Sequence, residues 1–168
     1  MTLPQVACQV VLAVVFAVSA VTKIRSVAAL RAFASSLTAV PSGSRMTVAV
    51  GVAGAEAAVP FLMLVPPLGL ALSGLLLAGF TAVIVASMRA GVRTPCRCFG
   101  GSATPLGPVH VTRNALLLLV VVTGLIALVR PGGQAPLEGL AVAASAGLVG
   151  AVLLIVLDDI VDLVKGKA

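Results

Sequence analysis

Two cysteines separated by one residue stand in the polar, glycine-rich string Cys96-Arg97-Cys98-Phe99-Gly100. Arg97 and the preceding Arg93 bring positive charge to the pair, and nearby cations favour the thiolate, which is the reacting form of cysteine. A disulfide between neighbours so close in sequence would be constrained, and strained disulfides are more easily reduced. It would close almost no loop and therefore stabilise little through chain entropy. The pair therefore predicts thiol–disulfide chemistry, with Cys96 and Cys98 as catalytic residues and Arg97 in support.

Two alternatives to redox chemistry remain open for these cysteines. Paired thiolates also suit soft metal ions, so a soft-metal carrier that uses Cys96 and Cys98 as ligands is one alternative. His110 is the only histidine of the chain, so a closed four-ligand zinc site lacks ligands. The other alternative is a non-catalytic membrane assembly subunit whose cysteines are incidental. Cys8 lies in an apolar run and is interpreted as an apolar packing residue without a redox role. No cofactor is predicted beyond the redox-active disulfide, and a bound quinone or soft metal stays open.

Glu56 lies in the middle of an apolar run, where a carboxylate is costly and indicates a functional site with a specific partner. The candidate partners are Lys23 and Arg113. Dithiol oxidation releases protons, so an acid near the pair could accept them; alternatively, an ion pair would only set the helix register. His110 is a candidate proton carrier, although a histidine at a membrane interface more often only forms a hydrogen bond. Asn114 is expected to hold the cysteine loop by hydrogen bonds to its backbone.

Composition requires that these residues be positioned by helices in a lipid bilayer. Of the 168 residues, 60% are hydrophobic and 10% are charged, with a mean hydropathy of +1.22. Soluble domains carry about 25% charged residues, because their surface faces water. A surface as apolar as this one must face lipid, so the lipid bilayer is a predicted partner. The fold class is all-α, a polytopic transmembrane helical bundle.

A bilayer span needs about 20 apolar residues. Residues 1–130 are predicted to form a four-helix core with the cysteine loop at 93–101, and residues 131–168 an additional transmembrane helix with a short polar tail. A further helix, over Ser26–Val40, is amphipathic and is expected either to lie in the interface or to pack under the bundle. Gly51 and Gly54 predict close approach of a neighbouring helix. The expected spans are Val6–Thr22, Thr47–Val65, Leu68–Met88, Val111–Val129 and Leu137–Leu157.

The net charge of +6 is concentrated in two gaps between spans that contain no acid. Positive residues gather on the cytoplasmic side of membrane proteins. We therefore expect a bacterial-type inner membrane protein with its N-terminus outside and the cysteine loop on the cytoplasmic side. Nucleic acid is not an expected partner, since the chain has no Trp and no Tyr for base stacking. Eight of the eleven basic residues lie in or beside the two gaps: Lys23, Arg25, Arg31, Arg45, Arg89, Arg93, Arg97 and Arg113.

The chain resembles the MauE family of methylamine-utilisation membrane proteins, within the wider DoxX-like group. The resemblance lies in Ser19-Ala20-Val21-Thr22-Lys23 at the end of the first span, Glu56, the Cys-x-Cys-Phe-Gly string at 96–100, and Arg113-Asn114 at the start of the fourth span. It implies thiol–disulfide oxidoreductase chemistry alongside a thioredoxin-like partner, during disulfide handling or maturation of exported proteins. Cys96 and Cys98 would be the redox pair, and Glu56, Lys23, Arg113 and Asn114 supporting bundle residues. Two features depart from the family: the span at 137–157 lies beyond the usual four-helix core, and the chain has no thioredoxin domain of its own.

Overall fold

The computed structural model describes residues 1–37, 40–89, 108–130, 135–157 and 160–161. Its described part is almost entirely helical and contains no strand, which confirms the all-α fold class. Among the described residues, five helical segments are long and apolar enough to cross a membrane, so the chain is a multi-pass membrane protein. The elements are α1 (Leu3–Ile24), α2 (Val27–Ser36), the 3₁₀ turn η1 (Ser42–Ser44), α3 (Arg45–Leu62), α4 (Pro66–Arg89), α5 (Pro108–Val129) and α6 (Leu137–Ile155).

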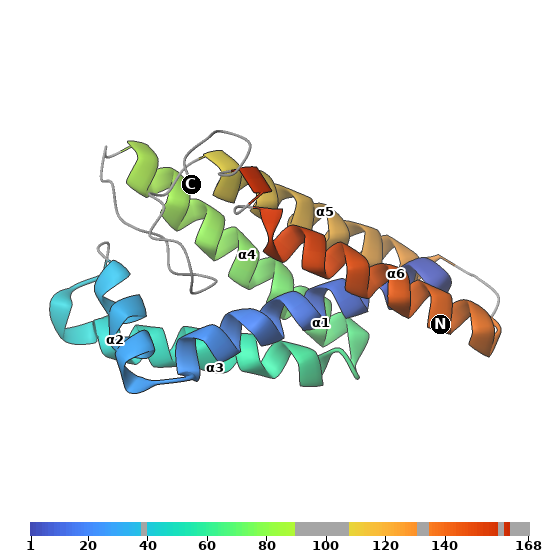
Figure 1. Cartoon of the computed structure of the whole chain (residues 1–168), viewed down its shortest axis with the longest axis horizontal. Helices are drawn as coiled ribbons and strands as arrows, with labels where there is room; N and C mark the ends of the chain where they lie inside the picture. The colour runs from blue at the N-terminus through green and yellow to red at the C-terminus, as the bar shows by residue number, and fades with distance from the viewer. Residues whose placement is uncertain (38–39, 90–107, 131–134, 158–159, 162–168) are drawn as a thin grey trace.

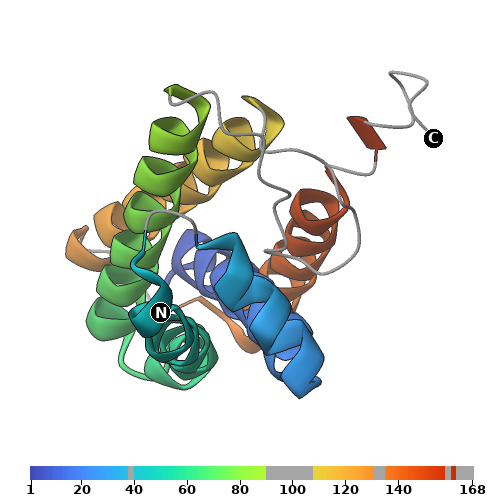
Figure 2. The ribbon, with the colours of Figure 1, turned by 90° about the vertical axis from the view of Figure 1, so that its left-hand side faces the viewer.

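Four of the spanning helices form a ring, in the order α1, α3, α4, α5 and back to α1 (Figures 1 and 2). Helix α6 lies outside this ring and packs along α1, so the predicted four-helix core with a fifth helix is confirmed. The apolar side chains inside the ring come from all four helices, which is how each helix covers the face that it turns away from lipid. The buried core includes Leu12, Val15 and Phe16 of α1, Val59 of α3, Leu70 and Leu77 of α4, and Leu117 and Val121 of α5.

Small residues let α6 approach α1 closely. Ala143, Gly147 and Ala151 recur every four residues and are buried, so they form a stripe on one face of the helix. A Cβ atom at Gly147 would lie 2.7 Å from the carbonyl oxygen of Ala7 on α1. Helices in lipid associate by such close packing, because no hydrophobic driving force operates between them there.

The hairpin between α3 and α4 is tight, as the two adjacent prolines predict. Helix α3 ends at Leu62 and α4 begins at Pro66, a position where the missing proline N–H would have no helical partner anyway. Gly69 faces the preceding turn at close range, since a Cβ there would lie 2.9 Å from the carbonyl oxygen of Leu62. Any larger residue would push the two helices apart.

Helix α2 packs on the bundle through one face. Ser26 caps it by accepting a hydrogen bond from the Ala29 N–H at 3.0 Å. Phe33 and Ala34 are buried against Ala49 of α3, whereas Arg31 on the other face is exposed. The helix expected over residues 26–40 therefore exists over a shorter range, and it is packed against the bundle on one side and exposed on the other.

The described residues at the ends of both basic gaps between spans lie at the same end of the bundle. Helix α1 ends and α3 begins at the end that carries α2, and α4 ends and α5 begins there as well (Figures 1 and 2). We call this the α2 end. Arg25, Arg31 and Arg89 are exposed at this end, and Arg45 is half-buried. Lys23 differs from the other basic residues of the first gap between spans, because it lies within α1 and its side chain is buried.

Candidate functional site

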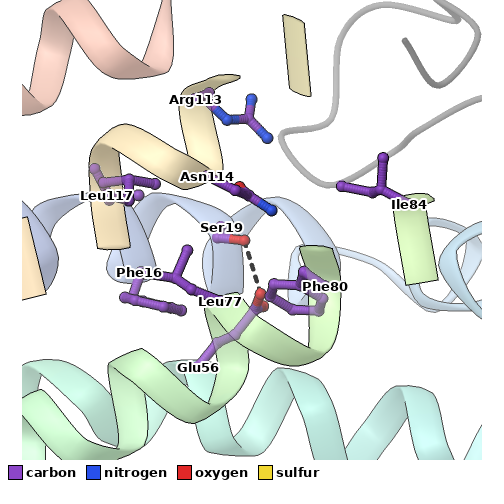
Figure 3. A pocket seen from close by; sticks show the side chains of 10 residues that line it. Phe16, Ser19, Glu56, Leu77, Phe80, Ile84, Arg113, Asn114 and Leu117 are labelled. Carbon is purple, nitrogen blue, oxygen red and sulfur yellow. Dashed lines mark hydrogen bonds between the residues drawn. The ribbon is translucent and has the colours of Figure 1, made fainter. Parts of the chain in front are cut away.

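A buried ion pair joins α1 to α3. The Lys23 Nζ atom lies 2.8 Å from Oε2 and 2.9 Å from Oε1 of Glu56, and only 1% of Lys23 and none of Glu56 is exposed. Ser19 lies one helical turn before Lys23 and so occupies the same face of α1. Its hydroxyl donates to Glu56 Oε1 at 2.9 Å (Figure 3). The same hydroxyl accepts from Lys23 Nζ at 2.7 Å. Of the two candidate partners of Glu56, the structure therefore selects Lys23.

Aromatic rings from two other helices approach the ammonium group. The Lys23 Nζ atom lies 4.9 Å from the ring centre of Phe33 on α2 and 5.8 Å from that of Phe80 on α4. Ring faces attract a desolvated cation. A buried charge is tolerated only when good geometry and additional contacts offset its desolvation, and Lys23 has both. Four helices thus contribute to holding one lysine, through Ser19, Glu56 and the two phenylalanines.

A cavity of about 20 Å³ lies beside the ion pair, between α1, α3, α4 and α5 (Figure 3). Its polar wall consists of Ser19, Glu56, Arg113 and Asn114. The rest of the lining is apolar: Val15, Phe16, Leu77, Phe80, Ile84 and Leu117. The predicted residues Glu56, Arg113 and Asn114 therefore meet around one small space, although they come from different helices.

The three predicted residues at the start of α5 are buried, with 5% of His110, 3% of Arg113 and 4% of Asn114 exposed. Arg113 and Asn114 line the cavity, whereas His110 is not part of its lining. The Asn114 amide donates to the Thr81 hydroxyl of α4 at 3.4 Å, so it links the two helices. Its predicted contact with the cysteine loop lies outside the described residues.

Cys96, Arg97 and Cys98 lie outside the described residues, in the segment that joins the end of α4 to the start of α5. Cys8 is buried in α1, with a free thiol. A Cβ at Gly124 of α5 would lie 3.4 Å from that of Cys8, which agrees with an apolar packing role. Within the described ranges, no group of three or more His, Cys, Asp or Glu side chains could hold a metal ion.

A family model described as methylamine utilisation protein MauE matches residues 1–127. The chain belongs to the MauE family. The matched residues contain α1 to α4 and nearly all of α5, so the four-helix ring is the family part of this protein and α6 lies beyond it. No curated protein and no solved structure matches the chain.

Sequence reasoning missed several residues of the site in this MauE-family chain. Ser19 belongs to the string that carries the family resemblance but was given no role of its own, although it precedes Lys23 by one turn of a predicted helix. Phe33 and Phe80 are far from Lys23 in the sequence, and no local pattern connects them to it. Pro60 lies inside α3, four residues after Glu56, and its missing N–H removes the helical hydrogen bond to the Glu56 carbonyl. The spacing between Glu56 and Pro60 could therefore have predicted that the Glu56 carbonyl lacks its helical hydrogen bond.

Proposed function

We propose that this MauE-family protein is an integral membrane thiol–disulfide redox protein, in which Cys96 and Cys98 relay reducing equivalents to or from a thioredoxin-like partner. The observation that carries the proposal is the Cys-x-Cys pair itself, with Arg97 between the two cysteines and Arg93 three residues before the first, in a chain of this family. These cations favour the reactive thiolate.

Chain connectivity limits how far the pair can lie from the end of α4. Cys96 follows Arg89, the last residue of α4, by seven positions, and Cys98 precedes Pro108, the first residue of α5, by ten. An extended chain spans at most about 3.6 Å per residue, so Cys96 stays within roughly 25 Å of the end of α4. Glu56 and His110 are then candidates for handling the protons of the exchange, with Lys23 and Arg113 as supporting charges, since a guanidinium keeps its proton.

The proposed exchange has two steps and balances without a further reactant. A thiolate of the Cys96–Cys98 dithiol attacks the disulfide of the thioredoxin-like partner, which forms a mixed disulfide and releases one partner thiolate that takes up a proton. The second cysteine then attacks the mixed disulfide, so Cys96 and Cys98 become joined and the partner leaves as a dithiol. Two electrons and two protons pass to the partner. Run in reverse, the same steps reduce the membrane protein.

The proposed setting is a bacterial inner membrane, with the cysteine loop on the cytoplasmic side and a role in disulfide handling or maturation of exported proteins. The exposed arginines at the α2 end, Arg25, Arg31 and Arg89, support this orientation. In spheroplasts, a membrane-impermeant thiol reagent is expected to leave Cys96 and Cys98 unlabelled until the membrane is permeabilised. Labelling of both cysteines in intact spheroplasts would reverse the orientation and leave the redox proposal standing.

Covalent trapping tests the redox proposal itself. In a Cys8→Ser background, the variants Cys96→Ser and Cys98→Ser each keep one thiol of the pair, and one of them is expected to retain a thioredoxin-like protein through a mixed disulfide on non-reducing purification. The matched control carries both substitutions and is expected to retain none. The proposal fails if neither single variant traps a partner and the unmodified protein shows the same number of free thiols under oxidising and reducing conditions.

A further inference from the structure

Within the described residues, Asn114 and Glu56 have hydrogen-bonding capacity at the cavity that their neighbours there do not use. An amide side chain offers two N–H donors and an oxygen with two lone pairs. In the described part of the chain, the buried amide of Asn114 makes one hydrogen bond, to Thr81, and that bond is long at 3.4 Å. Glu56 has about four acceptor positions. The described residues supply three donor contacts: Ser19 and Lys23 each donate to Oε1, and Lys23 also donates to Oε2, which accepts no other.

Unused capacity is costly in these surroundings. A buried polar group without a hydrogen bond is destabilising, and inside a membrane-spanning bundle bulk water is not at hand to supply the missing bond. Figure 3 shows the Asn114 amide extending from α5 into the space that Glu56 reaches from α3. A molecule that both donates and accepts hydrogen bonds would satisfy the two side chains at once.

The size of the cavity decides which molecule this is. A water molecule needs roughly 10–15 Å³ and two to four polar partners. The cavity has about 20 Å³ and four polar residues in its lining. An aromatic or quinone ring needs several times that volume and would have to displace Phe16, Leu77 or Leu117, which are almost fully buried.

We propose that this cavity is a structural water site, in which an ordered water molecule is hydrogen-bonded to the Asn114 amide and the Glu56 carboxylate. The water links Asn114 of α5 to Glu56 of α3 by hydrogen bonds. It therefore connects α5 to the ion pair that joins α1 and α3. It also gives the buried carboxylate a neighbour through which protons can exchange toward α5. This inference goes beyond the proposed redox function and holds whether or not the cysteines cycle.

Radiolytic hydroxyl labelling of the full chain in lipid nanodiscs, followed by mass spectrometry, tests the site. A bound water generates the radical in place and modifies the side chains beside it. Leu77 and Leu117 line the cavity, whereas Leu12 and Leu70 do not, and all four are at most 2% exposed. We expect the two lining leucines to be modified at least about threefold more than the other two, because only they adjoin a water position. Equal modification of the four leucines would overturn the proposal.

Two variants extend the test. Asn114→Leu replaces the amide by an apolar side chain of similar size and is expected to lower the modification of Leu77 and Leu117 to the level of Leu12. The control is Ser73→Ala, which removes another buried polar group, one whose hydroxyl donates to the Gly69 carbonyl at 2.7 Å and does not line the cavity. This control is expected to leave the pattern unchanged. Unchanged modification in a folded Asn114→Leu variant would show that Asn114 does not hold the water, and if that variant does not fold, the comparison of the four leucines in the unmodified protein still decides.

Discussion

The buried ion pair should behave as a unit, so that breaking it costs more than removing it. Glu56→Leu removes the carboxylate that pairs with Lys23. The buried ammonium group then keeps its contacts with the Ser19 hydroxyl and with the Phe33 and Phe80 rings. Lys23→Met together with Glu56→Leu removes both charges and keeps similar side-chain volumes in the same place. A methionine in that position still packs well against aromatic rings.

The magnitude follows from the geometry of the pair. Both carboxylate oxygens lie within 2.9 Å of the ammonium nitrogen, and neither side chain is more than 1% exposed. Removal of one partner from such a pair costs about 3–5 kcal/mol, whereas replacement of both by well-packed apolar residues is often neutral. We therefore expect the free energy of unfolding to fall by about 3–5 kcal/mol in Glu56→Leu and to recover by at least about 2 kcal/mol in the double variant.

The assay is equilibrium unfolding in mixed micelles of increasing SDS fraction, followed by far-ultraviolet circular dichroism. Intrinsic fluorescence is a poor probe here, because the chain contains no Trp and no Tyr. Glu138→Gln is the matched control: this acid lies in the first turn of α6 and is exposed, so its change should stay within about 0.5 kcal/mol. Lys23→Met alone completes the cycle. A double variant whose loss equals the sum of the losses in Glu56→Leu and Lys23→Met would refute the reasoning, since it would show that the charges act independently.

Two further changes test the packing around this site and the fifth helix. Gly147→Ala places a Cβ 2.7 Å from the Ala7 carbonyl oxygen, and the resulting shift of α6 should lower the free energy of unfolding by about 1–3 kcal/mol in the same assay. The control, Gly150→Ala, meets only an ordinary contact at 3.6 Å and should be nearly neutral. Equal losses in the two variants would contradict the packing argument. Phe33→Leu removes the ring 4.9 Å from Lys23 and should cost about 1–2 kcal/mol. In a Lys23→Met background this cost should shrink, and an undiminished cost there would mean that Phe33 acts only through α2 packing.

Much of this fold followed from local sequence. Twenty-residue apolar runs separated by charged or proline-containing gaps specify spanning helices, because backbone groups in lipid must be bonded within their own segment. The five spans are therefore where composition predicts them. The isolated acid at Glu56 likewise indicated a buried charge that needs a basic partner. The proposed roles of Cys96 and Cys98 rest on sequence, because those residues lie outside the described part of the chain.

Only the tertiary structure decided which partner Glu56 has. Lys23 and Arg113 were equal candidates in sequence, but α1 packs beside α3, whereas α5 lies diagonally across the ring from it. The close helix contact predicted at Gly51 and Gly54 was wrong for the described chain, since nothing there lies within 4 Å of a Cβ at either position; the close approach occurs at Gly147 instead. Apolar periodicity inside a membrane is weak, because lipid and protein interior are equally apolar. The rotation of each helix and the choice of its neighbours are therefore set by packing and by the few polar contacts between helices.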